Sequence, residues 1–419
     1  MWQRKYTLLA QLTCILSFLV ISCSSAKPEQ IPPTEPVDDI NTTIKKVALT
    51  PTITTGSERM DAYLPQLRDK KIGVTGNHSS LVNGKHLVDT LLAQGVEVKK
   101  IFSPEHGFRG TADAGERIES GKDVKTGLPV ISLYGKNKKP TQEQLDGIEL
   151  MIFDIQDVGA RFYTYISTMH YVMEACAEKG IPVMILDRPN PNGYYVDGPV
   201  LREELKSFIG MHPVPVVHGM TVAEYAQMIN EEGWLEKNHK CELILIPCLN
   251  YTHTSRYELP VPPSPNLKTV ASIALYPSIC FMEGTIVSVG RGTENPFTVL
   301  GYPQYPDTIF SFTPKPREGA KDPTYKNQRC YGLNLAPEAE LLLQNGKVEL
   351  KWLVDMYSKA PDKKKFFTSN SFDKLTGDKK IKEMLINGKS AQEMEAYWKP
   401  EVGSFKTTRK KYLLYPDFE

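Results

Sequence analysis

The chain has 419 residues, with 50 Lys and Arg against 49 Asp and Glu, and a formal net charge of +1. Because neither a basic stripe nor an acidic tail accompanies this balance, nucleic acid is excluded as an expected partner. The seven cysteines form no C-x-x-C pair, and the sequence has no H-E-x-x-H motif. Because these are the patterns typical of zinc sites, no metal is predicted.

The N-terminal segment is predicted to be a processing signal rather than part of the fold. Arg4 and Lys5 precede an apolar run over residues 8–21, which is shorter than the roughly 20 residues that span a bilayer. The run ends in Val-Ile-Ser-Cys, which resembles a bacterial lipobox and predicts a signal peptide over residues 1–23 with lipidation of Cys23. We therefore expect a lipid-anchored protein of the cell envelope, facing the periplasm or at the outer membrane. The alternative is an ordinary secretory signal in which Cys23 is incidental.

The next segments divide into a tether and two folded domains. Residues 24–55 are rich in proline and poor in aromatics, which is typical of a flexible tether. Residues 56–258 alternate short apolar runs with amphipathic ones, which predicts βαβ units and a Rossmann-like, mostly parallel sheet. The expected strands are 71–75, 96–102, 130–134, 150–155, 182–186 and 242–247, and the expected helices are 86–94, 142–147, 168–179 and 221–232. The rhythm then changes at a proline-rich break, and residues 259–419 are predicted to form a smaller α+β domain that closes the cleft.

Polar side chains follow five successive predicted strands. Because parallel strands end at one edge of a sheet, these side chains are expected to face a single crevice. The candidates are Asn77, His78, Glu105, His106, Arg109, Asp154, Gln156, Asp157, Arg161, Tyr163, Tyr165, Arg188 and Asn190. In the second domain, Arg291 lies in a glycine-rich loop that lacks the Lys-Ser/Thr ending of a phosphate loop and is a candidate to close the cleft.

Glu105 has the most informative setting of these residues. It follows the strand 96–102 within Ser-Pro-Glu-His-Gly-Phe-Arg-Gly, where glycines let the backbone turn sharply. Functional carboxylates concentrate in such clefts, although a surface carboxylate is the alternative interpretation. Arg109 and Arg161 equally fit structural bridges to Asp113 and Asp157.

The missing motifs narrow the chemistry. The turn after the first strand is not G-x-G-x-x-G, which disfavours a dinucleotide, and no cofactor is predicted. No G-x-S-x-G elbow occurs, so a serine hydrolase lacks its signature. A crevice of carboxylates, tyrosines and arginines suits glycoside hydrolysis, in which an acid protonates the leaving oxygen and a second group acts at the anomeric carbon.

Several long motifs resemble the NamZ-type exo-β-N-acetylmuramidases. They lie at residues 103–110, 153–165 and 186–191, at Gly284, and at residues 290–296. The resemblance implies a Rossmann-like domain joined to a smaller C-terminal domain, with the active cleft between them. It also implies release of N-acetylmuramic acid from the non-reducing ends of peptidoglycan fragments, with Glu105 as the catalytic residue.

A mechanism follows as a hypothesis. Glu105 is expected to be the general acid, held protonated by partial burial between the two domains. Its partner is Asp154, Asp157, Glu116 on the following loop, or the 2-acetamido oxygen of the substrate itself.

Two arginines and two rival functions complete the expectations. Arg109 or Arg161 is expected to bind the lactyl carboxylate that distinguishes N-acetylmuramic acid from N-acetylglucosamine. The rivals are a non-catalytic lipoprotein that binds muropeptides and a wall-directed esterase or amidase, for which Ser79 is the candidate nucleophile.

Overall fold

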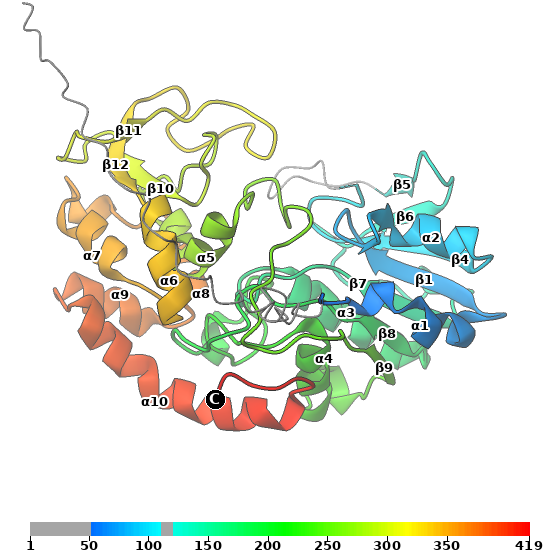
Figure 1. Ribbon diagram of the computed structural model, residues 1–419. Helices are drawn as coiled ribbons and strands as arrows, with labels where there is room; N and C mark the ends of the chain where they lie inside the picture. The colour runs from blue at the N-terminus through cyan, green and yellow to red at the C-terminus, as the bar shows by residue number, and fades with distance from the viewer. Residues whose placement is uncertain (1–51, 110–119) are drawn as a thin grey trace, which may run out of the picture. The chain divides into compact units, whose positions relative to one another are not determined.

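A seven-stranded, mostly parallel sheet organises the first part of the chain in this computed structural model, which describes residues 52–109 and 120–419 (Figure 1). The strand order is β5-β6-β4-β1-β7-β8-β9, and only the β5–β6 pair is antiparallel. The strands are β1 (Lys71–Gly76), β4 (Glu97–Ser103), β5 (Gly121–Lys122), β6 (Pro129–Ser132), β7 (Leu150–Asp154), β8 (Val183–Leu186) and β9 (Leu243–Ile246). A separate hairpin pairs β2 (Leu81–Val82) with β3 (Lys85–His86).

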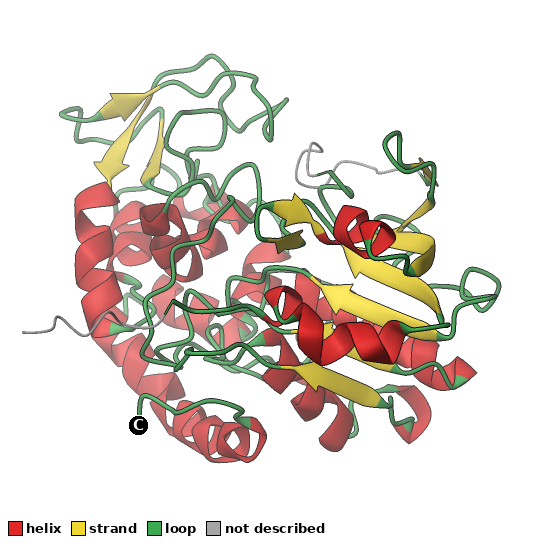
Figure 2. Cartoon of the chain, turned by 45° about the vertical axis from the view of Figure 1, so that its right-hand side comes forward, coloured by secondary structure: helices red, strands yellow, loops and turns green. Residues whose placement is uncertain are grey.

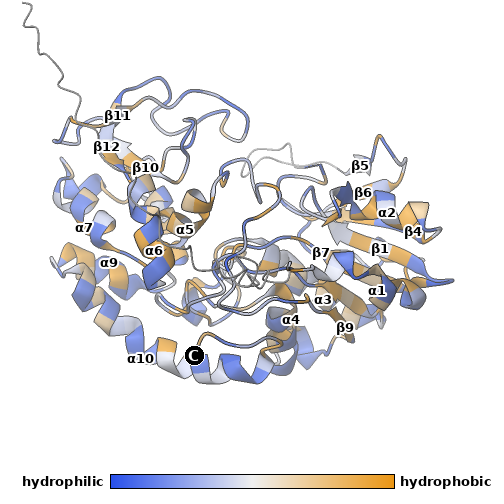
Figure 3. Ribbon diagram, viewed as in Figure 1, coloured by the Kyte–Doolittle hydropathy of each residue, from blue (hydrophilic) through white to orange (hydrophobic). Residues whose placement is uncertain are grey.

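Both faces of this sheet are covered by helices, as Figure 2 shows. Alternate residues of β7 enter different hydrophobic clusters, Leu150 and Ile152 on one face and Met151 and Phe153 on the other. A parallel sheet buried on both sides requires such continuously apolar strands, and Figure 3 shows hydrophobic residues running along them. The first face packs against α1 (Met60–Leu67) and α2 (Leu87–Ala93), and the second against α3 (Tyr165–Lys179) and α4 (Val222–Glu231).

The six strands expected from the sequence are confirmed, whereas the helix expected over residues 142–147 is wrong. That segment forms hydrogen-bonded turns instead. Thr141 and Gln144 bond to each other's backbone as at a helix start, but Gly147 takes a φ of +75° only three residues later. A single turn does not repay the cost of nucleating a helix.

The second part of the chain combines a small antiparallel sheet with helices, and the expected α+β character is confirmed. The sheet has the order β10-β12-β11. Its strands are β10 (Val299–Tyr302), β11 (Ser311–Phe312) and β12 (Cys330–Asn334). The helices are α5 (Val270–Ile279), α6 (Ala339–Asn345), α7 (Lys351–Ser358), α8 (Ser371–Thr376), α9 (Lys379–Ile386) and α10 (Ala391–Arg409). The boundary at residues 258 and 259 stays a prediction.

Short 3-10 helices connect many of these elements. They are η1 (Gly56–Glu58), η2 (Glu203–Leu205), η3 (Glu236–Asn238), η4 (Cys280–Gly284), η5 (Ala336–Glu338), η6 (Lys363–Lys365) and η7 (Lys410–Tyr412). Of the predicted tether, residues 52–55 are described, and Thr54 pairs with Leu249 in an isolated β-bridge.

The end of the chain returns to the first sheet. After α10, the guanidinium of Arg409 donates to the carbonyl of Gly219 and pairs with Asp417. The Tyr415 hydroxyl donates to the carboxyl of Asp187, just after β8, over 2.5 Å. The C-terminal residues therefore complete the packing of the first part of the chain.

The remaining sequence expectations concern cysteines and the membrane. The cysteines that follow the predicted signal are all buried with free thiols, as expected for small hydrophobes: Cys176, Cys241, Cys248, Cys280 and Cys330. Within residues 52–109 and 120–419, no helix has the length and apolar character needed to cross a membrane.

Candidate active site

Glu105 lies in the wall of two adjoining cavities at the carboxyl edge of the large sheet. The larger cavity has a volume of about 740 Å³ and the smaller one about 60 Å³. Both are lined by Glu105, Phe162 and Thr164 from the first part of the chain, and by Tyr276 and Arg291 from the second. The larger volume falls within the range of small-molecule sites, so the two parts of the chain together form a site for a ligand.

Hydroxyl groups surround the carboxyl group of Glu105, which is half-buried. The Thr164 hydroxyl, at the N-terminus of α3, donates to Oε2 of Glu105 over 3.0 Å. Burial, together with the negative charge of Glu105 and a hydrogen bond to it, raises the pKa of Tyr134. Burial and the charge of Glu105 also raise the pKa of Tyr165. Both tyrosines therefore stay protonated at neutral pH, and Tyr134 is hydrogen-bonded to the carboxyl group.

A tight turn presents Glu105 to the cavity. The amide of Gly107 donates to the carbonyl of Pro104 over 3.2 Å, and both His106 and Gly107 have positive φ, at +69° and +77°. A side chain at such a φ costs about 1–2 kcal/mol, and residues of this kind cluster at functional sites. His106 is itself buried and lines the smaller cavity, as expected.

Aromatic rings form one wall of the smaller cavity. Tyr163 and Tyr165 meet edge to face with their centroids 4.8 Å apart, and Phe162 contacts Tyr276 at 5.3 Å. The hydroxyls of both tyrosines donate to the carbonyl of Pro263, over 2.9 and 3.3 Å. The two predicted tyrosines therefore reach the cavity and also anchor the proline-rich break against it.

Arg291 carries a positive charge on the side contributed by the second part of the chain. Its Nε donates to Oε1 of Glu283 over 2.5 Å, and its guanidinium lies 4.9 Å from the ring centroid of Phe297. Burial alone lowers the pKa of Arg291, but the charge of Glu283 outweighs this and raises it. The predicted place of Arg291 at the cleft agrees with this geometry.

Asp154 and Arg188 are paired away from both cavities. Each is buried, and the pair is bidentate, with Nε–Oδ1 at 2.6 Å and Nη2–Oδ2 at 2.9 Å. Arg188 also donates to the hydroxyl of Ser57 and the carbonyl of Leu81. Burial raises the pKa of Asp154, although Arg188 opposes the shift. The expected role of Asp154 as second catalytic group therefore has no support in this geometry.

Arg161 and Arg109 are also occupied by protein partners. Arg161 is fully buried and donates, over 2.7–2.9 Å, to the carbonyls of Pro199, Val214, Leu375 and Thr376. Arg109 forms a bidentate pair with Asp123, at 2.8 and 3.0 Å. Neither arginine lines the cavities, so neither is placed to bind the lactyl carboxylate as expected. The structural alternative is supported by these described partners; Asp157 is not among the partners of Arg161, and Asp113 lies outside the described residues.

Gln156, Asp157 and Asn190 lie beneath the site and shape its loops. Gln156 donates to the carbonyl of Pro189, and Asn190 donates to the carbonyl of Met220. Asp157 accepts from the amide of Gly159 over 2.7 Å, and burial raises its pKa to about 7. These three predicted binding residues are buried rather than exposed to the cavities.

Asn77 and His78 lie at the end of β1. Asn77 is fully buried and accepts from the hydroxyl of Ser79 over 2.6 Å. His78 lines a third cavity of about 300 Å³ and contacts the carbonyl of Pro262 over 2.8 Å. Ser264 borders both this cavity and the small one beside Glu105, so His78 faces a neighbouring compartment.

Several cavity residues were not predicted, and two predicted residues lie outside the description. The unpredicted ones include Tyr134, Phe162, Thr164, Phe208, Tyr276 and Glu283. Thr164 lies within the motif over residues 153–165, and Tyr134 ends the expected strand 130–134. The sequence therefore carried a signal that could have identified both as site residues. Tyr276 and Glu283 follow the proline-rich break, where no local pattern marks them. Glu116 and Cys23 are outside the described residues.

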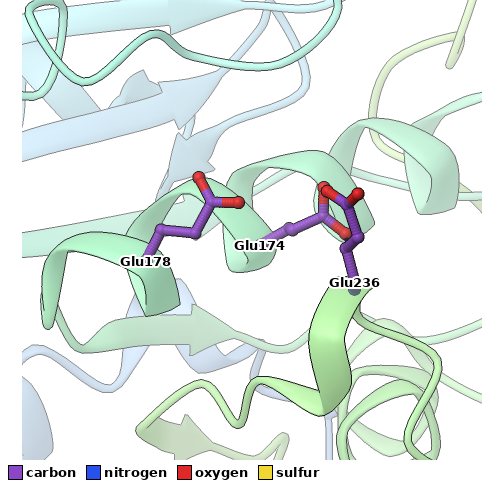
Figure 4. Close-up of side chains that lie close together, drawn as sticks. All are labelled: Glu174, Glu178 and Glu236. Atoms are coloured by element: carbon purple, nitrogen blue, oxygen red, sulfur yellow. Dashed lines mark hydrogen bonds between the residues drawn. The ribbon is translucent and has the colours of Figure 1, made fainter.

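A cluster of three carboxylates lies apart from the cavities. Glu174 and Glu178 project from α3 and Glu236 from η3, as Figure 4 shows. The ammonium of Lys139 contacts Glu174 at 2.6 Å and Glu178 at 2.8 Å. Lys139 therefore already pairs with two of the three carboxylates, and we assign the cluster no metal.

Comparisons with known proteins identify the family. Models described as the N-terminal and C-terminal parts of the exo-β-N-acetylmuramidase NamZ match residues 72–271 and 274–415. The peptidoglycan β-N-acetylmuramidase NamZ of Bacillus subtilis is 37% identical over 98% of this chain and 100% of the relative.

Two crystal structures of DUF1343 family proteins from Bacteroides fragilis share the fold. One has a TM-score of 0.82 and 45% identity, covering 88% of this chain and 100% of its own. The other has a TM-score of 0.71 and 28% identity, covering 87% of this chain and 99% of its own. The two domain models together span most of the chain, and the chain belongs to the NamZ family of exo-β-N-acetylmuramidases, a glycosidase family, as its motifs indicated.

Proposed function

We propose that this protein releases N-acetylmuramic acid from the non-reducing ends of peptidoglycan fragments, with Glu105 as the general acid. The observation that carries the proposal is the carboxyl group of Glu105 in the wall of a sugar-sized cavity, beside the donors Thr164 and Tyr134. Family membership and the activity named for the Bacillus subtilis relative support the reaction class.

The cavity supplies the groups that glycoside hydrolysis needs. Glu105 would protonate the departing glycosidic oxygen, while Thr164 orients its carboxyl group. The rings of Phe162, Tyr163 and Tyr276 offer apolar faces to a sugar. Asp154 is enclosed by its own partner, and Asp157 is buried and does not line the cavities. The second role is therefore assigned to Glu116 or to the 2-acetamido oxygen of the substrate.

Replacing Glu105 tests the proposal directly. We expect Glu105→Gln to lower kcat on a chromogenic N-acetylmuramide by about 100-fold to 10,000-fold, because the amide cannot supply a proton. The matched control is Glu97→Gln at the exposed start of the same strand, which should leave turnover unchanged. Near-normal turnover by a folded Glu105→Gln protein would refute the assignment.

The rival functions make different predictions. A protein that only binds muropeptides would release no free sugar during prolonged incubation with a muramide. For an esterase or amidase, the candidate nucleophile Ser79 is buried and its hydroxyl donates to Asn77, so no observation favours that chemistry.

We also propose that Cys23 carries a lipid that anchors the protein in the cell envelope, facing the periplasm or at the outer membrane. The lipobox-like Val-Ile-Ser-Cys sequence supports this proposal. A labelled fatty acid should be incorporated into the expressed full-length chain and not into Cys23→Ser. Equal labelling of the two proteins would contradict the anchor.

A further inference from the structure

We propose that Arg291, positioned by Glu283, binds the lactyl carboxylate and so selects muramyl over glucosaminyl chain ends. This inference rests on the proposed function, because it names the residue that gives the same site its substrate preference. Its basis is the part of the Arg291 guanidinium that remains available for a ligand.

Arg291 reaches the same space as the general acid. It lines both the large cavity and the small one, in each case together with Glu105. Its side chain is 26% exposed. Among residues 52–109 and 120–419, its only hydrogen-bond partner is Glu283, which takes Nε over 2.5 Å. Within this described part of the chain, no protein acceptor takes the two terminal amino groups, which together match the two oxygens of a carboxylate.

The local backbone holds this guanidinium in place. Gly290 and Gly292 flank Arg291 with φ values of +81° and +82°. A Cβ atom on Gly290 would lie 2.6 Å from the side chain of Val299, and one on Gly292 would lie 2.6 Å from Pro323. The loop can follow this tight path only with glycine at both positions. With Glu283 fixing Nε from η4, Arg291 is preorganised for a planar anion.

Other cations are poorer candidates for the same role. Arg109, Arg161 and Arg188 are each engaged by protein partners and do not line these cavities. Lys321 lines the larger cavity, but an ammonium is a point charge that cannot form two parallel hydrogen bonds with one carboxylate. Of the guanidinium groups in the described part of the chain, Arg291 alone faces Glu105 across the cavities.

The test compares two substrates that differ in the lactyl group. Hydrolysis of a chromogenic N-acetylmuramide and a chromogenic N-acetylglucosaminide is to be measured for the wild-type protein, Arg291→Gln and Arg291→Lys. We expect Arg291→Gln to lower kcat/KM for the muramide on the order of 100-fold, chiefly through KM, because two charge-assisted hydrogen bonds are lost. The same variant should change the glucosaminide value by less than about three-fold, since that sugar lacks the carboxylate. The kcat/KM of Arg291→Lys for the muramide should lie between the values of the wild-type protein and Arg291→Gln.

Arg317→Gln is the matched control for disturbing this loop. Arg317 pairs with Glu294 of the same glycine-rich segment at 2.7 Å, and its side chain is 30% exposed. It does not line the cavities beside Glu105. We expect this variant to keep both kinetic values and the preference between substrates.

The outcomes separate this inference from the proposed function. An unchanged muramide preference in Arg291→Gln, or an equal loss on both sugars, would overturn the role of Arg291. If the wild-type protein releases no product from the muramide, the proposed function fails. Calorimetric titration with free N-acetylmuramic acid and N-acetylglucosamine then still tests Arg291, because the preference for the acid must disappear in Arg291→Gln.

Discussion

At the scale of single residues, Asp157 is a carboxylic acid enclosed by protein beneath the tyrosines of the site. It is 5% exposed, accepts from the amide of Gly159, and has a pKa raised by burial to about 7. Between its ordinary value of 3.8 and about 7, the folded protein keeps a proton that the unfolded chain has lost. Unfolding therefore releases a proton in this window, so the free energy of unfolding contributed by Asp157 decreases as the pH rises.

Asp157→Asn should remove this dependence. The amide oxygen can still accept from Gly159, and the side chain no longer titrates. We expect the stability of the variant relative to wild type to increase by up to about 1.4 kcal/mol per pH unit between pH 4 and 7. Urea unfolding at several pH values measures the difference. A difference that is constant across this range would show that Asp157 is ionised throughout.

The arginines show why residue type alone did not identify the ligand-binding groups. A guanidinium has five donors, and when it is buried those donors must be satisfied. In Arg161 the partners are carbonyl groups, and in Arg188 the main partner is Asp154. Only the positions of these distant partners distinguish a structural arginine from one that faces a ligand.

At the scale of elements, Arg161 joins the segment after β7 to α8. Its guanidinium bonds the carbonyls of Leu375 and Thr376, and a Cβ atom on Gly377 would lie 2.4 Å from its Nη2. Arg161 thus links elements that are more than 200 residues apart in the chain.

Removing the hydrogen bonds of Arg161 should destabilise the fold without changing substrate preference. Arg161→Met leaves buried carbonyls without donors, and we expect a loss of about 3 kcal/mol or more. Gly377→Ala should act in the same direction, because a side chain there needs both a positive φ and the space of the guanidinium. Denaturant midpoints measure both effects. A normal denaturant midpoint for Arg161→Met combined with a lost preference for the muramide would contradict this structural role and indicate that Arg161 binds the substrate.

The secondary structure was predictable where the pattern is local and long. Strands such as β7 and β8 are unbroken apolar runs, and α4 carries a capping box at Thr221 and Glu224 that marks its start. The segment at 142–147 has a similar start but stops within one turn. A capping signal starts a helix only if enough residues follow to repay nucleation.

At the scale of the whole molecule, the C-terminal segment ties the second part of the chain to the first. Tyr415 bonds Asp187, and the amide of Leu414 donates to Glu224 over 2.8 Å. Arg409 bonds Gly219 from the end of α10. Residues 52–109 and 120–419 accordingly fall within one compact unit.

This connection predicts cooperative unfolding. We expect calorimetry to show a single transition, because separating the two parts would expose the paired groups at the end of the chain. Removing residues 413–419 should lower the transition temperature strongly, whereas Tyr415→Phe, which loses one hydroxyl, should cost about 1–2 kcal/mol. Two resolved transitions in the wild-type protein would contradict this account.

The sequence by itself determined six strands of the large sheet, the helices α2, α3 and α4, the mostly parallel pairing, and the place of Glu105 at a strand end. Each of these follows from patterns within a few residues, since a strand end and the turn after it are neighbours in the chain. Only the tertiary structure separated the charged candidates that reach the cavity from those that do not. Glu283 and Arg291, which follow the proline-rich break in the chain, line the larger cavity together with Glu105. Asp154 is instead paired with Arg188 and lines neither cavity. Hydrogen-bond satisfaction depends on partners brought together by folding, and one-dimensional spacing does not contain them.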